Sequence, residues 1–391
     1  NNGYRGRTSS GIEILFYKGL YHESLKLIAK AETLAKECEN FQLMIDILIW
    51  KKKCSGYSLG LKKAASANGE IDKYIELLTN LKRITDLYYE SNLLQANNEK
   101  YSKNEIVKKM ESILQKPELK KHTNALSFSA KIFFHLIYSN YYYTIDLKDK
   151  ELEHLQKLVD ILNASKTYAI ENPLDYVSIY NRLLAIKKHF PDSTFFGDID
   201  RLKEFGTKTY IRKDIIIQRV FVHTNTHELE YYLINNEFQS ALTKTKTIEK
   251  EISKLDIDIE PYHMIYFYYL QAITLIYLGE FNKSLKYINR ILNDFEMDSR
   301  PQVFLRASIL NAIIHYELKN YSLVALICKQ ALKNNLAKKI LIPLEETLLK
   351  SLIKIVNAKE FTIKQELFIF QNMSAEIAEF KKTNQSKASS L

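Results

Sequence analysis

The stretch 261–332 carries the same pattern of residues twice, and this repetition constrains the fold more than any other feature of the chain. In each copy a small residue is followed, after a short intervening segment, by an aromatic residue. A segment with apolar side chains at helical spacing begins at this aromatic. The second copy follows the first after 40 residues. The matching sets are Ala272, Gly279, Phe281, Ser284, Leu285, Ile288 and Ile291, and then Ala312, Lys319, Tyr321, Val324, Ala325, Cys328 and Ala331.

This pattern predicts two consecutive helical hairpins. The small side chain of Ala272 lets the second helix approach closely, and Phe281 fills the gap at the turn. Gly279 can adopt the left-handed conformation that ends the first helix. A hairpin of this kind cannot bury its apolar face alone, so we expect neighbouring hairpins stacked on both sides.

Two further stretches carry the pattern less completely. In 11–36, Ile12 stands where Ala272 stands in the clearest copy. In 228–254, Thr245 replaces the apolar residue of the other copies, and the aromatic precedes Phe281 by 43 residues. The matching residues are Gly19, Tyr21, Ser24, Leu25, Ile28 and Ala31 in the first of these stretches, and Phe238, Ala241, Leu242 and Ile248 in the second.

The pattern resembles the tetratricopeptide repeat, with spacings longer than the usual length of about 34 residues. The resemblance implies an all-α solenoid of helical hairpins, wound as a right-handed superhelix with irregular, long repeats. It covers residues 11–36 and 229–332 most clearly. The N-terminal block is also similar to a large group of uncharacterised bacterial helical-repeat proteins, to which no activity is attached.

Composition agrees with an all-α fold and narrows the setting. Only 10 glycines and 6 prolines occur in 391 residues, which disfavours the many tight turns of an all-β fold. The three cysteines form no CxxC motif, so we expect a reducing compartment and a cytoplasmic protein. Charged residues interrupt every apolar run, so no membrane insertion is expected. A net charge of +10, with interspersed charges, fits a solvated basic surface better than a nucleic-acid site.

Four regions are expected along the chain. Residues 1–10 are a polar lead-in of a truncated chain, 11–206 form an N-terminal helical-repeat half, 207–382 form a C-terminal half, and 383–391 form a disordered tail. Within them, 54–69 is expected to be a loop, and the β-branched run 215–222 is expected to be helical. Asp192 or Ser193 is expected to cap a short helix, and Phe361–Lys381 to form the last helix.

No residue pattern indicates catalysis or a cofactor. His223 and His227 are spaced for one helical face, but the glutamate of an HExxH zinc site is absent, so a structural histidine pair is expected. The segment 56–63 lacks the spacing of a phosphate loop, and no Ser or Cys nucleophile can be paired with a His. We therefore expect no enzymatic activity, metal or cofactor.

A lysine-rich run lies outside these patterns. Five lysines and no acidic residue occur between Asp46 and Glu70. Such a run contacts an anionic partner or is simply the solvated end of a helix, where cations are favoured by the helix dipole.

The surplus of 26 tyrosines indicates where a partner binds. If 261–278 is an inner helix of a repeat, Tyr266, Tyr269 and Tyr277 line the concave face, and the next inner helix adds Arg306 and Tyr316. Tyrosine and arginine anchor many binding surfaces. The alternative is that these tyrosines fill the core between long helices.

The sequence therefore predicts a non-enzymatic scaffold of the tetratricopeptide type that binds a protein or peptide on its concave face. The alternative is a nucleic-acid-binding or regulatory helical-repeat module that uses a basic inner surface. The basic clamp of chaperone-binding tetratricopeptide proteins is matched at Arg306 alone, so a chaperone tail is not the expected ligand.

Overall fold

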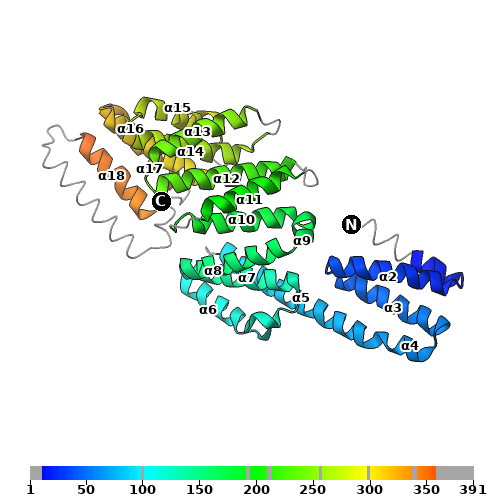
Figure 1. Cartoon of the computed structure of the whole chain (residues 1–391). Helices are drawn as coiled ribbons and strands as arrows, with labels where there is room; N and C mark the ends of the chain where they lie inside the picture. The colour runs from blue at the N-terminus through cyan, green and yellow to red at the C-terminus, as the bar shows by residue number, and fades with distance from the viewer. Residues whose placement is uncertain are drawn as a thin grey trace. The chain divides into compact units, whose positions relative to one another are not determined.

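The computed structural model describes residues 11–97, 101–190, 194–208, 214–254, 258–296, 300–336 and 341–357. All regular secondary structure in these ranges is helical, and no strand occurs in them. The prediction of an all-α fold is therefore confirmed for this part of the chain. Within each of two compact units, many consecutive helices pack against one another, as in a helical repeat (Figure 1). The right-handed superhelical winding stays a prediction.

The chain divides into two compact units, Asn1–Ile186 and Lys187–Leu391. In the first unit, residues 11–17 are helical, and the packed pairs include α2 with α3, α3 with α5, α5 with α7 and α7 with α8. Its helices are α2 (Tyr21–Glu37), α3 (Phe41–Ser58), α4 (Leu61–Ala65), α5 (Ala67–Ala96), α6 (Lys103–Leu114), η1 (Pro117–Leu119), η2 (His122–Asn124), α7 (Phe128–Thr144), α8 (Lys148–Ala164), α9 (Lys166–Glu171) and α10 (Pro173–Lys187).

In the second unit each helix packs on the next, and α14 also contacts both α12 and α16. The helix Phe195–Thr207 packs on α12 within this unit. The helices are α11 (Phe195–Thr207), α12 (Asp214–Ile234), α13 (Phe238–Ile252), α14 (Pro261–Tyr277), α15 (Phe281–Asp294), α16 (Pro301–Glu317), α17 (Tyr321–Leu336) and α18 (Pro343–Asn357).

Six of the described turns between helices share one geometry. One residue has a left-handed backbone with φ between 46° and 74°, and two backbone hydrogen bonds of 2.8–3.2 Å close the end of the preceding helix. This is the Schellman arrangement, which satisfies carbonyls that the helix end would leave without partners. The left-handed residues are Gly19, Glu39, Asp146, Asn236, Gly279 and Lys319. Gly19, Asn236, Gly279 and Lys319 all stand two residues before the aromatic of their copy, so the predicted register is correct at the turns.

The register also explains why a serine recurs in the second helix of the hairpin. Ser284 is fully buried, and its Oγ donates a hydrogen bond of 2.9 Å to the carbonyl of Ala272. Ser24 makes the same contact, at 3.3 Å, with the carbonyl of Ile12. In the stretch 11–36, the larger Ile12 therefore takes the position of Ala272 without loss of this hydrogen bond between the helices. Thr245, which departs from the apolar pattern, donates its hydroxyl to the Leu242 carbonyl at 2.7 Å.

Ala272→Leu is expected to lower the free energy of unfolding by about 1–3 kcal/mol, because overpacking displaces neighbouring side chains. Ala272 is fully buried in a cluster with Ile265, Ile288 and Ile291. Ile273→Leu, at the adjacent half-buried position, is the volume-conserving control and should cost less than about 1.5 kcal/mol. Urea denaturation followed by far-UV circular dichroism measures both, and equal midpoints for the two variants would contradict the close approach at Ala272.

Lys319→Gly is expected to stabilise the protein by about 1 kcal/mol, because a side chain is strained in the left-handed region. Lys319 has φ +60° and is exposed, so glycine removes strain without removing packing. Gly279→Lys makes the reverse change in the preceding hairpin. A Cβ at Gly279 would meet no atom within 4 Å, so its cost is conformational alone. Thermal melts of the two variants should shift in opposite directions, and shifts of the same sign would contradict this account of the turns.

The structure corrects two local predictions. The expected loop at 54–69 is largely helical: α3 continues to Ser58, α4 follows, and α5 begins at Ala67. Gly60, at φ +90°, interrupts the helical path between α3 and α4. The N-cap of α11 is Thr194, whose side chain does not cap the helix. Asp192, Ser193 and Phe361–Lys381 lie outside the described residues.

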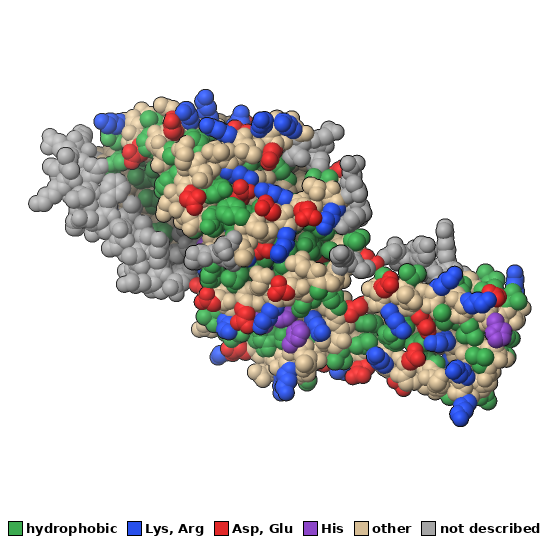
Figure 2. Space-filling view, viewed as in Figure 1, with side chains coloured by type: hydrophobic (Ala, Val, Ile, Leu, Met, Phe, Trp, Pro, Cys, Tyr) green, Lys and Arg blue, Asp and Glu red, His purple; other side chains and the backbone are tan. Residues whose placement is uncertain are grey.

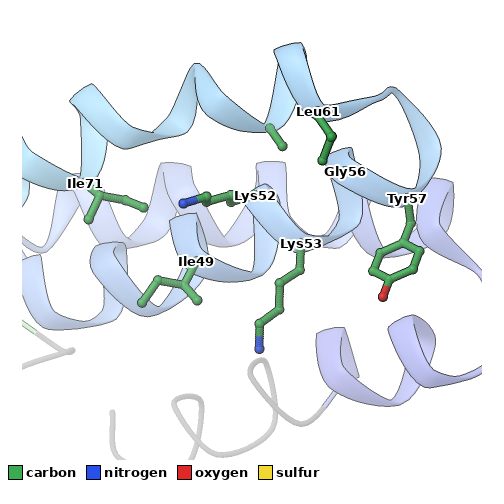
Figure 3. Close-up of a pocket in the computed structure, with 8 residues that line it drawn as sticks. Ile49, Lys52, Lys53, Gly56, Tyr57, Leu61 and Ile71 are labelled. Carbon is green, nitrogen blue, oxygen red and sulfur yellow. The ribbon is translucent and has the colours of Figure 1, made fainter.

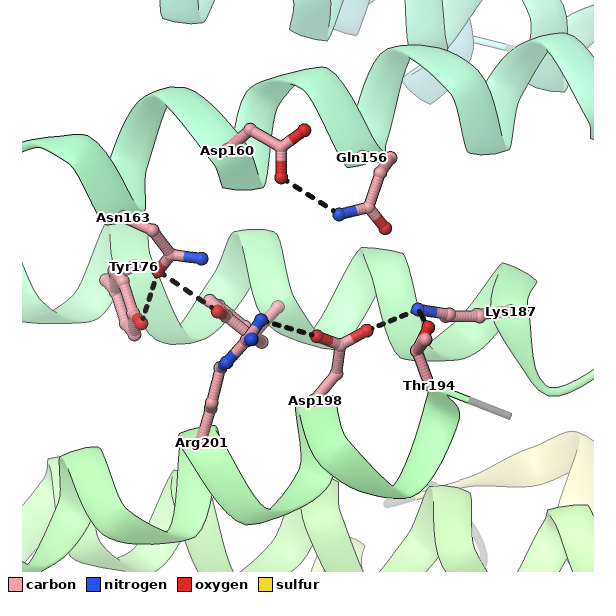
Figure 4. A network of polar contacts seen from close by, with 9 residues as sticks. Gln156, Asp160, Asn163, Tyr176, Lys187, Thr194, Asp198 and Arg201 are labelled. Atoms are coloured by element: carbon pink, nitrogen blue, oxygen red, sulfur yellow. Dashed lines mark hydrogen bonds and ion pairs between the residues drawn. The ribbon is translucent and has the colours of Figure 1, made fainter. Parts of the chain in front are cut away.

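A buried ion pair lies at the start of the second unit. Lys187 and Asp198 are 2% and 3% exposed, and Lys187 Nζ lies 2.5 Å from Asp198 Oδ2 (Figure 4). Thr194 Oγ1 also accepts a hydrogen bond from Lys187 Nζ. Arg201 approaches the other carboxylate oxygen from the surface, at 3.4 Å. The pair joins Lys187, the first residue of the second unit, to α11 of the same unit.

Candidate binding surface

The candidate surface lies on helices α12, α14 and α16, which are the first helices of three consecutive hairpins. We call it the inner-helix face and define it by Glu230, Tyr266, Tyr269, Arg300 and Arg306. These side chains come from α12, α14 and the start of α16, and each interacts with at least one other member. All five belong to the second unit. None of the five is fully exposed or fully buried.

Glu230, on α12, is the polar centre of this face. Its carboxylate lies 2.5 Å from Lys188 Nζ and 3.1 Å from His227 Nδ1, and it accepts a hydrogen bond of 2.6 Å from the hydroxyl of Tyr266. Burial alone would raise the pKa of Glu230, but the hydrogen bond from His227 and the charge of Lys188 outweigh burial and hold this pKa well below its usual range. Glu230 is therefore a fixed negative charge that ties α14 to α12.

Arg300 extends this cluster at the beginning of α16. Its guanidinium lies over the rings of Tyr262 and Tyr266, at 4.1 and 4.2 Å from their centroids. It also donates a hydrogen bond of 3.2 Å to the carbonyl of Tyr262. Stacking of a guanidinium between aromatic rings is favourable and holds the planar group in one orientation.

Tyr269 and Arg306 form the next part of the face. The ring of Tyr269 stacks on that of Tyr266 with centroids 6.1 Å apart. Burial raises the pKa of the Tyr269 hydroxyl. The charge of Arg306 lowers this pKa, and the charges of Glu345 and Tyr277 raise it, so these groups lie close enough to interact electrostatically. Arg306 Nε lies 3.6 Å from the carboxylate of Glu345 on α18, an ion pair too long for a hydrogen bond.

Two donor groups on this part of the face, the Arg306 guanidinium and the Tyr269 hydroxyl, have no hydrogen-bond partner within the described residues. The Nε of Arg306 is buried without one, and the remaining guanidinium nitrogens of Arg306 donate none either. The hydroxyl of Tyr269 likewise makes no hydrogen bond there. A ligand with acceptor oxygens could satisfy both groups.

The two other predicted residues lie at the C-terminal ends of their helices. Tyr277 is 61% exposed and stacks on Phe238, with ring centroids 4.4 Å apart. Tyr316 is half-buried and lies 5.7 Å from the ring of Tyr321. Both rings therefore contact the aromatic that opens the second helix of a hairpin.

Three of the predicted tyrosines pack against buried clusters, as the core alternative expects. Tyr266 and Tyr269 pack against the buried clusters around Ile265 and Phe267, and Tyr316 packs against the cluster around Leu305. The hydroxyl of Tyr266, by contrast, belongs to the polar network of Glu230. These residues form the outer layer of the core, with polar atoms available at its surface.

Arg300 of the inner-helix face, and the partners Lys188 and Glu345 that contact the face, are absent from the predicted set of site residues. Glu230 stands at an inner-helix position of its copy, but a lone glutamate gives no signal of a buried network. Lys188 follows α10, and Glu345 lies on α18, so neither belongs to a hairpin that carries the repeat register. Arg300 directly precedes Pro301, and this proline at the first turn of α16 could have located it at a helix start.

The histidine pair of α12 lies beside this network. His227 is buried and contacts Glu230, while His223 is half-buried with its ring 6.4 Å from that of His263. Burial, and then the nearby His227, His263 and Arg219, lower the pKa of His223 to about 4. Within the described ranges, no group of three or more His, Cys, Asp or Glu residues is arranged to hold a metal ion.

No family model matches this chain, and no curated protein matches it. Among the described helices, none combines the length and the apolar character needed to cross a bilayer.

Proposed function

We propose that this chain is a non-enzymatic helical-repeat scaffold, resembling tetratricopeptide proteins, whose inner-helix face binds an extended protein or peptide segment. The observation that carries the proposal is the pair Tyr269 and Arg306. Both side chains are held in place by neighbours, yet the Tyr269 hydroxyl and the Arg306 guanidinium donate no hydrogen bond within the described residues.

The chemistry of this pair suits a carboxylate or a peptide carbonyl. A guanidinium presents its donors in a plane that matches a carboxylate, and a neighbouring phenol adds a third donor. Arg300 lies on the same face and stacks on Tyr266, which itself stacks on Tyr269. The donors and rings thus extend over α14 and α16, and such a continuous surface suits an extended segment.

The same contacts favour a peptide over nucleic acid. A nucleic-acid site needs cations that remain available to phosphates. On this face Lys188 is neutralised by Glu230, and Arg306 lies beside Glu345. Binding should therefore depend weakly on salt, whereas several phosphate contacts would give a steep dependence.

The proposed setting is a reducing compartment such as the cytoplasm. Cys38, Cys54 and Cys328 are all free thiols. Two of them, Cys54 and Cys328, are buried, as is usual for cysteines that pack as small apolar side chains.

Site-specific photo-crosslinking tests the proposal in the cell of origin. A photoreactive phenylalanine analogue replaces Tyr277, which is 61% exposed and borders the inner-helix face. The matched control places the same group at Leu326 on α17, which is 52% exposed on the second helix of a hairpin. We expect one protein to be cross-linked from position 277 and not from 326. Equal cross-linking from both positions, or recovery of nucleic acid from 277, would contradict the proposed peptide-binding face.

A further inference from the structure

The first unit contains a groove that is separate from the inner-helix face. It lies between α3 on one side and α4 with the start of α5 on the other, and has a volume of about 560 Å³. Figure 3 shows Leu61 and Ile71 on the α4–α5 side and Ile49, Lys52, Lys53, Gly56 and Tyr57 on α3. We call it the α3–α5 groove and define it by Ile49, Lys52, Lys53, Tyr57, Leu61 and Ile71.

The walls of the groove expose large apolar side chains to water. Leu61 is 83% exposed, Tyr57 is 71% exposed and Ile49 is 40% exposed. The ring of Tyr57 is nevertheless fixed, because it stacks on Tyr21 with centroids 5.4 Å apart. Exposed apolar groups that cluster around one depression indicate a surface that a partner covers.

The positive charges around the groove are largely not neutralised. Of the five lysines in 47–69, Lys51 alone makes an ion pair within the described residues, with Glu32 at 2.9 Å and Glu70 at 3.9 Å. Lys52, Lys62 and Lys63 make none, and Lys53 lies over the ring of Trp50 at 4.3 Å. Figure 2 shows lysine side chains beside hydrophobic ones over α2–α4. The occupant should therefore be apolar on one side and negatively charged at its edges.

The dimensions of the groove favour a helix as the occupant. Its α3 wall runs from Ile49 to Tyr57, and at about 1.5 Å per residue this stretch is about 12 Å long. Two turns of a helix have about this length, and they place apolar anchors at i, i+3, i+4 and i+7 on one side. A membrane surface fits less well, because a flat bilayer would leave a concave groove unfilled.

We infer that the α3–α5 groove docks an amphipathic helix whose apolar stripe is flanked by acidic residues. The apolar stripe would cover Leu61, Tyr57 and Ile49, and the flanking carboxylates would pair with Lys52 and with the lysines of α4. This surface belongs to the first unit, and its occupant does not depend on what binds the inner-helix face.

The only tryptophan of the chain, Trp50, contacts Lys53 of the groove and serves as the reporter of its occupancy. It precedes Lys52 and Lys53 on α3, and the Lys53 ammonium lies over its ring. The probe is a blocked synthetic peptide of about 15 residues, with leucines at helical spacing, alanines elsewhere on the apolar side and glutamates at the edges. The comparison probe replaces every glutamate with lysine. We expect the acidic peptide alone to change the Trp50 emission of the full chain in a saturable way.

Matched variants locate the binding. Lys52→Glu and Leu61→Ser should each weaken the acidic peptide by about tenfold or more, since they remove a charge pair and an apolar anchor. Lys108→Glu and Leu93→Ser make the same changes at exposed positions outside the groove and should leave the affinity unchanged. All four positions are exposed, so the melting temperatures should stay close to that of the unmodified chain.

Three outcomes would overturn the inference. The first is an equal response to the acidic and basic peptides, and the second is no response to the acidic peptide up to about 1 mM, where any remaining affinity is very weak. The third is that vesicles of anionic lipid change the Trp50 emission and the acidic peptide does not. That result would assign the exposed apolar groups to a membrane surface.

Discussion

Asp198→Ala is expected to lower the free energy of unfolding of the second unit by about 3–5 kcal/mol, because it leaves the buried ammonium of Lys187 without its counter-charge. Lys187 is 2% exposed and lies 2.5 Å from the Asp198 carboxylate. Water cannot replace the lost partner at this depth. Urea denaturation followed by far-UV circular dichroism measures the change.

Arg201→Ala provides the matched control. Arg201 contacts the same carboxylate at 3.4 Å but is 62% exposed, so its loss should cost less than about 1 kcal/mol. The double variant Lys187→Met, Asp198→Leu should recover most of the stability, since both buried charges are then absent. If Asp198→Ala and Arg201→Ala cost the same, the buried pair does not contribute as its geometry implies.

Glu230→Gln is expected to cost about 2–4 kcal/mol at neutral pH, because it removes the charge that faces Lys188 and His227 in a largely buried site. The Lys188 and Glu230 side chains are only 12% and 14% exposed. Glu249→Gln is the matched control: Glu249 also accepts a hydrogen bond of 2.6 Å from a tyrosine, Tyr287, but it is exposed. The control should cost less than about 1 kcal/mol.

The effect of Glu230→Gln should depend on pH in a defined direction. The pKa of Glu230 in the folded protein lies below the value of about 4.3 that an unfolded glutamate has. Its contribution to stability is therefore fully present above pH of about 4.3 and is lost as the pH falls through the folded pKa. The difference in unfolding free energy between Glu230→Gln and the unmodified chain should be constant near pH 7 and shrink below pH of about 4. A difference that grows on acidification would contradict an ionised Glu230.

The fold could be predicted from the sequence wherever residue type and register agree. Gly19 and Gly279 identify two of the left-handed turns, and the register then gives the turns at Asn236 and Lys319. The turns at Glu39 and Asp146 have the same geometry but no glycine, so residue type gives no signal there. The loop prediction at 54–69 is wrong, because a helix tolerates most of the glycines and serines of this stretch.

The candidate surface could be predicted only within the repeat. Periodicity places Tyr266 and Tyr269 on the first helix of one hairpin and Arg306 on the first helix of the next, and these helices are α14 and α16. Their polar partners Lys188 and Glu345 come from segments without the repeat pattern, and only the packing of the helices brings them close. The availability of the Tyr269 hydroxyl and the Arg306 donors likewise follows from three-dimensional contacts and has no sequence signal.

The affinity of the partner cross-linked at position 277 for two conservative variants tests the central proposal most directly. Tyr269→Phe removes only a hydroxyl that makes no hydrogen bond within the described residues, and Arg306→Lys keeps the positive charge beside Glu345 but loses the planar donors. Both variants should therefore melt within about 2 °C of the unmodified chain. If the inner-helix face binds the partner, each variant should weaken binding by about tenfold, as the loss of an anchor residue does. Unchanged affinity in both variants, with unchanged melting, would contradict the inner-helix face as the binding site.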